Sequence, residues 1–429
     1  MFAVPLFVSR VFQQLYNTAD MVIAGYFLGE MSLAAIGAST VIFELLVVFT
    51  MGIGGGFGIV VSRSFGAGDV NLLKRTVAGS IVLGGFLTIL ISVIAGVFIL
   101  PVLKLLNTPA DILHETYSYL FILIIFTFVL FAYNLCVGLL RAIGNSFVPL
   151  MFLIFSSVLN VGLNILFVAG FGMGINGLAA ATVAAQGVSL VLCIVYIAKK
   201  CSVLLPAKEH FRYSAELYRE LTTQGLSMGF MMSIVSIGSV ILQWAINGLG
   251  YLVIAGHVAA RKVSSFCWIP ISSLAMALST FVSQNKGANQ AERIRKAVRY
   301  SNIFGVLWCV FISTVIFFSS SFLMRLLTGS NESVIIENSS RYLLINAPFY
   351  AILAVLFNLR LTLQGIGEKI VPVISSMIEL AGKAVFAFLI VPAFGYFGVI
   401  ISEPVIWCVM CLQLAFSYYR NPYIKKKAS

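Results

Sequence analysis

A polar stripe interrupts the first apolar segment of the chain. Gln13, Asn17 and Asp20 are spaced i, i+4 and i+7, so in a helix they share one face. An ionised carboxylate at the centre of a membrane-spanning helix costs at least about 2.5–3.5 kcal/mol, so Asp20 should face protein or water rather than lipid. Burial favours the protonated carboxyl, whereas a bound cation favours the carboxylate. A proton and a sodium ion would then compete for Asp20, as ion-coupled transport requires. The alternative is a cluster of hydrogen bonds between helices.

Two further apolar segments supply amide and hydroxyl oxygens, which are the ligands that a hard cation needs. Asn160 and Asn164 lie one helical turn apart in NVGLNILF, and Thr182 lies in AAATVAAQ. Spacing alone does not show that these oxygens meet Asp20.

Charged residues also lie inside apolar segments of the C-terminal half. Glu379 and Lys383 are spaced i, i+4 in IELAGKAV, and such a pair lowers the cost of both charges. Glu403, directly before Pro404, is a second acid in this half. These three residues form either buried structural pairs or, with Gln13 and Asn17, part of a substrate cavity.

Three neighbouring residues with basic side chains precede an apolar run. We expect Arg261 and Lys262 to extend toward the outer membrane interface. His257 could titrate near neutral pH, but a lone histidine in such a segment is more often a hydrogen-bonded packing residue.

The elements that carry these side chains are long and apolar. The chain of 429 residues is 60% hydrophobic and 10% charged, whereas soluble domains have about 25% charged residues. The apolar runs are continuous rather than alternating, which favours spanning helices over a barrel. Segments long enough to cross a bilayer number twelve. They lie near 1–27, 32–61, 76–102, 116–140, 148–170, 176–198, 220–248, 252–283, 299–323, 341–363, 369–392 and 396–419.

The net charge of +12 is explained by membrane topology rather than by nucleic-acid binding. The loops after the even-numbered segments, with the C-terminal tail, hold 20 of the 27 Lys and Arg residues. Arg360 and Lys369 are the two assigned to the loop after the tenth segment. The loops on the other side hold Lys104, Arg325 and Arg341. This asymmetry predicts cytoplasmic N- and C-termini in a plasma membrane protein. Because the first spanning segment starts at once, we expect a short cytoplasmic leader to precede it.

The two halves of the sequence repeat each other. SRSFGAGDVNLLKRTVAGS (62–80) aligns with SQNKGANQAERIRKAVRYS (283–301) at an offset of 221, and LRAIGNSFVPL (140–150) aligns with LQGIGEKIVPV (363–373) at an offset of 223. We therefore predict a two-residue slip after the ninth helix. The domains expected are an N-lobe (1–198, helices 1–6), a cytoplasmic linker (199–219) and a C-lobe (220–429, helices 7–12 and a basic tail). Six helices per half give both halves the same orientation, related by an axis along the membrane normal.

QQLYNTADMVIAG, followed by LAAIGAS, resembles the first two helices of the multidrug and toxic compound extrusion (MATE) transporters. GLLRAIGNSFVP (138–149) resembles the loop between their helices 4 and 5, and MALSTFVSQNKGA (276–288) resembles the second lobe. The resemblance covers almost the whole chain. It implies an all-α integral membrane protein of twelve helices, in two pseudo-symmetric six-helix lobes that form a V-shaped bundle. It also implies antiport: export of organic, often cationic, compounds in exchange for protons or sodium ions.

The resemblance implies a cation site as well. In one branch of the family, residues matching Asn160, Asn164 and Thr182 join the helix 1 aspartate, here Asp20, in a cation-coupling site of the N-lobe. These four residues would be the metal ligands if sodium is the coupling ion. The position of Asn164 can be an aspartate in that branch. Asparagine removes one charge, which weakens the case for sodium and leaves proton coupling more open.

Other functions are less well supported by the residues. The sequence has no HExxH or GxSxG motif and only three histidines, which argues against an intramembrane enzyme. A flippase for lipid-linked saccharides would call for a more cationic cavity. We expect no cofactor besides the coupling ion, no nucleic acid, small organic substrates and membrane lipid as partners, and a monomer.

Overall fold

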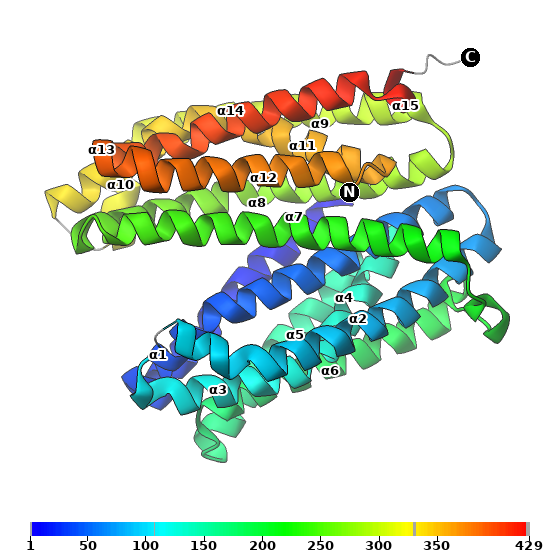
Figure 1. Ribbon diagram of the computed structural model, residues 1–429, viewed down its shortest axis with the longest axis horizontal. Helices are drawn as coiled ribbons and strands as arrows, with labels where there is room; N and C mark the ends of the chain where they lie inside the picture. The colour runs from blue at the N-terminus through cyan, green and yellow to red at the C-terminus, as the bar shows by residue number, and fades with distance from the viewer. Residues whose placement is uncertain (1, 107, 329–331, 426–429) are drawn as a thin grey trace. The chain divides into compact units, whose positions relative to one another are not determined.

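The chain is helical along almost its whole length in the computed structural model, which describes residues 2–106, 108–328 and 332–425 (Figure 1). No strand occurs among these residues. The first half contains α1 (Ala3–Gly66), α2 (Val70–Leu105), α3 (Ala110–Ile125), α4 (Thr127–Ala142), α5 (Phe147–Ile165), the π-helical turn η1 (Leu166–Gly170) and α6 (Gly174–Lys200). The short 3₁₀ turns η2 (Ser202–Leu204) and η3 (Lys208–Phe211) follow.

The second half has the same kind of element order. It contains α7 (Ala215–Asn247), α8 (Tyr251–Gly287), α9 (Ala291–Thr328), α10 (Ser333–Asn346), η4 (Ala347–Phe349), α11 (Tyr350–Ile366), α12 (Ile370–Val385), the π-helical turn η5 (Phe386–Ile390), α13 (Val391–Phe394), α14 (Tyr396–Arg420) and α15 (Pro422–Lys425). Six runs of this half are long and apolar enough to cross a bilayer, at 215–247, 251–287, 291–326, 333–366, 370–394 and 396–420.

The predicted all-α membrane fold is confirmed. Among the described residues, ten helices are long and apolar enough to span a membrane, and α3 with α4 adds an eleventh span that is bent by 46°. The part of α1 before Gly29 corresponds to the first of the twelve predicted segments but is not among these eleven spans. Gly29 has φ 81° and ψ −174°, a backbone conformation that ends one helix and begins the next, and that L-residues rarely adopt.

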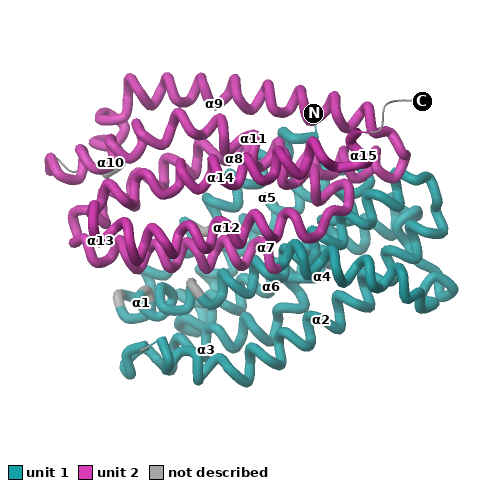
Figure 2. The backbone as a smooth tube through the Cα atoms, turned by 45° about the horizontal axis from the view of Figure 1, so that its top comes forward, with its two compact units in different colours: residues 1–229 teal, residues 230–429 magenta. Residues whose placement is uncertain are grey.

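The chain divides into two compact units, Met1–Gly229 and Phe230–Ser429 (Figure 2). The division falls inside α7, so the beginning of this helix packs with the first unit. Leu217 and Leu221 of α7 join Phe57, Val61 and Leu140 in the hydrophobic core of that unit. The boundaries predicted from the sequence, with a linker at 199–219, stay a prediction.

Glycines bring α1 and α7 into close contact inside the first unit. A Cβ atom on Gly52 would lie 2.6 Å from the Cα of Gly229, and one on Gly56 would lie 2.5 Å from the Gln224 carbonyl oxygen. Small residues four apart let helix backbones approach in this way.

The second unit has its own core, formed mainly by α8, α9, α10, α11 and α14. Ala260, Ile271, Leu343, Leu363 and Leu414 are among its fully or almost fully buried residues. α11 contacts α8, α9 and α14, and α12 contacts α14. The charged side chains described below are therefore held between packed helices.

The sequence repeat recurs in the backbone. Positive φ angles, which favour glycine, occur at matching positions of the two halves. The pairs at an offset of 221 are Gly29 with Gly250 and Gly68 with Asn289, and those at 223 are Gly144 with Gly367 and Gly172 with Gly395. The register therefore slips by two residues between the second and third pair. The loop after α9, where we placed the slip, includes residues 329–331, which lie outside the described part of the chain.

Candidate functional site

Asp20 contacts two buried asparagines in the first unit. It is half-buried on α1, and Asn160 and Asn164 of α5 are fully buried. The Asn164 Nδ2 atom donates to Asp20 Oδ1 at 2.6 Å. The structure thus brings together the acid and the amides that the sequence offered as separate candidates.

The second amide also turns toward the acid. In one orientation of its amide, the Asn160 Oδ1 atom accepts from Asn164 Nδ2 at 2.8 Å. In the other, its nitrogen donates to Asp20 Oδ1 at 2.8 Å and its oxygen accepts from the Thr182 backbone N–H at 3.3 Å, but the nitrogen then lies 2.8 Å from Asn164 Nδ2. In this second orientation one carboxylate oxygen of Asp20 accepts hydrogen bonds from both asparagines. This arrangement holds the carboxyl with neutral donors.

Hydroxyl groups complete the cluster, and one of them was missed by the sequence analysis. Tyr16, one turn before Asp20 on α1, has its hydroxyl beside the Asp20 carboxyl and 3.4 Å from Thr182 Oγ1, so its single proton is donated to one of the two at a time. The i, i+4 spacing of Tyr16 and Asp20 was a signal that could have found it. We call Tyr16, Asp20, Asn160, Asn164 and Thr182 the Asp20 cluster.

The Asp20 cluster has two features that bear on its chemistry. No Lys or Arg in the described part of the chain forms an ion pair with Asp20. The Asn164 Oδ1 atom is buried and has no hydrogen-bond partner, which costs about 1–3 kcal/mol for a neutral polar group. The cluster therefore contains a single charge and one spare acceptor.

Gln13, another residue of the predicted polar stripe, is not part of this cluster. Gln13 is exposed, about two turns before Asp20. The side chain of Asn17 lies outside the described residues, so its predicted place in a substrate cavity stays a prediction.

Glu379 and Lys383 form an ion pair in the second unit, as their spacing predicted. Lys383 Nζ lies 2.9 Å from Glu379 Oε1 and also donates to Ser239 Oγ at 3.0 Å. Arg360 of α11 approaches the other carboxylate oxygen, with Nη1 at 3.8 Å from Glu379 Oε2. Our assignment of Arg360 to a cytoplasmic loop was wrong, because α11 continues past it and buries its guanidinium beside Glu379.

Glu403 has a different basic partner. Arg261 of α8 forms an ion pair with its Oε1 atom, and the Tyr342 hydroxyl donates to its Oε2 atom at 2.7 Å. The guanidinium of Arg261 also lies over the Trp268 ring, 5.1 Å from the centroid. The expectation that Arg261 extends to the outer interface was therefore wrong, since a buried carboxylate attracts it inward, whereas Lys262 is exposed.

His257 packs beside the same group. Its Nδ1 atom lies 3.3 Å from the Tyr396 hydroxyl, and its ring meets the Tyr342 ring edge to face with centroids 5.2 Å apart. It is therefore a hydrogen-bonded packing residue, as the sequence favoured.

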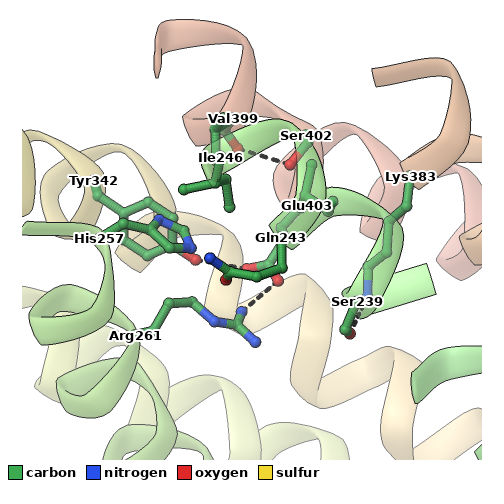
Figure 3. A pocket seen from close by; sticks show the side chains of 11 residues that line it. Ser239, Gln243, Ile246, His257, Arg261, Tyr342, Lys383, Val399, Ser402 and Glu403 are labelled. Carbon is green, nitrogen blue, oxygen red and sulfur yellow. Dashed lines mark hydrogen bonds and ion pairs between the residues drawn. The ribbon is translucent and has the colours of Figure 1, made fainter. Parts of the chain in front are cut away.

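A cavity of about 80 Å³ lies among these side chains within the second unit. Its polar lining comes from α7, α8, α10, α12 and α14 and includes Ser239, Gln243, His257, Arg261, Tyr342, Lys383 and Glu403 (Figure 3). Lys383 and Glu403 both line it, and Glu379 lies one turn before Lys383. The predicted place of these three residues in a substrate cavity stays a prediction.

A family profile and individual known proteins match this chain over most of its length. The profile of the MatE family matches residues 5–166 and 228–389. Two similar proteins come from Bacillus subtilis (strain 168). Probable multidrug resistance protein YoeA is 29% identical over 100% of this chain and 94% of its own length, and Probable multidrug resistance protein YpnP is 26% identical over 88% and 84%.

Solved structures agree with these sequence matches at the level of the fold. A crystal structure of MATE in complex with MaL6 superposes with a TM-score of 0.90 at 21% identity, covering 99% of this chain and 96% of that one. An outward-facing multidrug resistance MATE family transporter of the MOP superfamily also reaches 0.90, at 22% identity and the same coverage. The two matched segments of the family profile are themselves 223 residues apart, the offset of the internal repeat.

Proposed function

The chain belongs to the MatE family of multidrug efflux transporters, and we propose that it exports organic cations in exchange for protons, with Asp20 as the group that takes up the proton. Members of this family are multi-pass membrane transporters rather than enzymes. The proposal concerns the coupling ion, the charge of the substrate and the residue responsible. A cytoplasmic position of both termini is part of it.

The observation that supports the proposal is the isolation of Asp20 from positive charge. A carboxylate in a spanning helix is expensive unless it is paired or neutralised. Its partners in the Asp20 cluster are amides and hydroxyls, so a proton or a metal ion must neutralise it when water is excluded. Ions that bind one conformation more tightly than another shift the equilibrium between the two, which is the requirement for alternating access.

The orientation of the amides favours the proton. Asn164 donates an N–H group to Asp20, and Asn160 does so in one of its two amide orientations, whereas a sodium ion would need both amide oxygens turned toward it. A protonated Asp20 becomes a donor, and the unpartnered Asn164 Oδ1 atom can accept from it once that amide rotates. The Asp20 cluster therefore has one hydrogen-bonding pattern for each protonation state, and uptake of the proton would change the contacts between α1 and α5.

Reconstituted vesicles test this proposal. The Asp20→Asn variant and the wild type would be compared for export of a cationic dye, with proton and sodium gradients imposed separately. We expect the wild type to respond to the proton gradient, and the variant to insert normally but lose gradient-driven transport. Asp111→Asn is the matched control, because Asp111 is exposed in the first turn of α3.

Two results would count against the proposal. Undiminished transport by Asp20→Asn would remove this residue from the mechanism. Transport driven by sodium alone would replace the proton by sodium while retaining the Asp20 cluster as the site.

A further inference from the structure

The second unit contains a buried network with more positive than negative charge. Arg261 pairs with Glu403, and Lys383 and Arg360 share Glu379. The charge of Lys383 also acts on Glu403, so the two groups form one network. With both carboxylates ionised, three cations face two anions. Protonation of His257 would add to the excess.

An excess charge of this kind needs compensation. A buried ion left without a partner costs several kcal/mol, and removal of one member of a buried pair is strongly destabilising for this reason. The carboxylates are already engaged: Glu403 accepts from Arg261 and Tyr342, and Glu379 accepts from Lys383. The Arg261 side chain keeps 32% of its surface exposed, and an anion from outside the network would supply the missing negative charge.

A negative charge in the cavity would lie beside two of the three cations. Arg261 and Lys383 both line it, one from α8 and one from α12, together with the neutral side chains of Gln243 and Ser239 (Figure 3). Guanidinium and ammonium groups have N–H donors to spare after one carboxylate contact, because they carry five and three respectively. A cavity of about 80 Å³ has room for roughly two to three water-sized groups.

We infer that this cavity binds one small monovalent anion, a halide ion or a small carboxylate, between Arg261 and Lys383. The anion balances the network and fixes α7, α8, α12 and α14 around it. Anions with several charges would overcompensate a single excess charge. The site lies within the second unit and does not involve the Asp20 cluster, so it stands apart from the proposed proton coupling.

Halide binding can be measured on the purified protein without any ion gradient. Iodide quenches indole fluorescence, and Trp268 lies over Arg261. We expect saturable quenching by sodium iodide at constant ionic strength in sodium gluconate, reversed by chloride. Reversal by acetate would identify small carboxylates as ligands too, and its absence would restrict the site to halides. The same halide should raise the melting temperature to a plateau.

Variants separate a specific site from a general salt effect. Gln243→Glu places a carboxylate in the cavity, so it should abolish the saturable quenching and the dependence of the melting temperature on halide. The double variant Arg261→Gln/Glu403→Gln removes one cation with its partner and should weaken binding roughly tenfold or more, as expected for the loss of a charge-assisted hydrogen bond. Lys262→Gln, an equal charge change at an exposed neighbour, should leave binding unchanged.

Clear outcomes would overturn the inference. Quenching that rises linearly with iodide and no plateau in stability would show that no anion binds. Halide affinity that persists in Gln243→Glu would place the anion elsewhere. Because these measurements need no transport, loss of dye export in Asp20→Asn neither supports nor weakens them.

Discussion

If the Asp20 cluster couples transport to an ion as proposed, single side chains decide which ion it can use. Among the described residues Asp20 has only neutral partners, and the residue at position 164 determines whether the cluster holds one negative charge or two. A second carboxylate would repel the first and attract a metal ion more strongly. The chemistry of this cluster therefore depends on one amide.

Asn164→Asp tests that dependence. We expect the variant to export a cationic dye in response to a sodium gradient at constant pH, because two carboxylates bind a hard cation better than one. An equal potassium gradient is the control. If sodium has no effect on the variant, the oxygens of the Asp20 cluster do not converge on a metal ion.

Glu379 offers a prediction about stability at the same scale. Glu379→Gln leaves Lys383 and Arg360 without a carboxylate, and breaking a buried ion pair in this way costs about 3–5 kcal/mol. We expect a markedly lower melting temperature in detergent. Glu379→Gln/Lys383→Met removes the ion pair as a whole and should recover part of the loss; a double variant less stable than the single one would contradict this explanation.

Whole helices set the positions of these side chains, and glycines set the distance between helices. α1 lies close enough to α7 in the first unit that Gly52 and Gly56 leave no space for a Cβ atom, whereas one on Gly54 would have no heavy atom within 4 Å. The three glycines belong to the same run, MGIGGGFG (51–58). They therefore differ in the side of the α1 helix on which each lies, rather than in their sequence surroundings.

A pair of substitutions tests this contact. Gly56→Val should destabilise the protein by about 1–3 kcal/mol, as overpacking does, because its side chain would press on the backbone of α7. Gly54→Ala should be tolerated or slightly stabilising, since alanine favours a helix by up to about 1 kcal/mol over glycine. Thermal unfolding of both variants in detergent is the measurement, and equal destabilisation would show that helix propensity rather than contact governs this run.

At the scale of the whole molecule, the distribution of Lys and Arg predicts its orientation. Arg360 must be removed from the loops that we counted, but the remaining loop residues keep the same asymmetry. The loop containing η3 should therefore lie in the cytoplasm and the beginning of α3 outside.

Cysteine labelling tests this orientation. Lys208→Cys should react with a membrane-impermeant maleimide only in inverted vesicles, and Asp111→Cys only in intact cells. The native cysteines at 136, 193, 201, 267 and 309 are buried and those at 408 and 411 are partly buried, so unsubstituted protein gives the background. The reverse labelling pattern would invert the topology.

The sequence by itself determined the spanning helices, their number and the repeat. Hydrocarbon admits only backbones that satisfy their own hydrogen bonds, so long apolar runs are read directly as helices. The positive φ angle at Gly144 and its counterpart at Gly367 follow from the local sequence of each half, LRAIG and LQGIG. The i, i+4 ion pair of Glu379 and Lys383 is local too, which is why spacing predicted it.

Only the tertiary structure decided which charges meet across helices. Arg261 pairs with Glu403, which is 142 residues away, and Arg360 is drawn from its supposed loop to Glu379. No periodicity encodes such pairs, because a buried charge takes whichever partner the packing of other helices brings within reach. The same holds for Asp20 and Asn164, which are 144 residues apart. The sequence showed that an acid in a spanning helix needs hydrogen-bonding or charged partners, and helix packing places neutral amides beside Asp20.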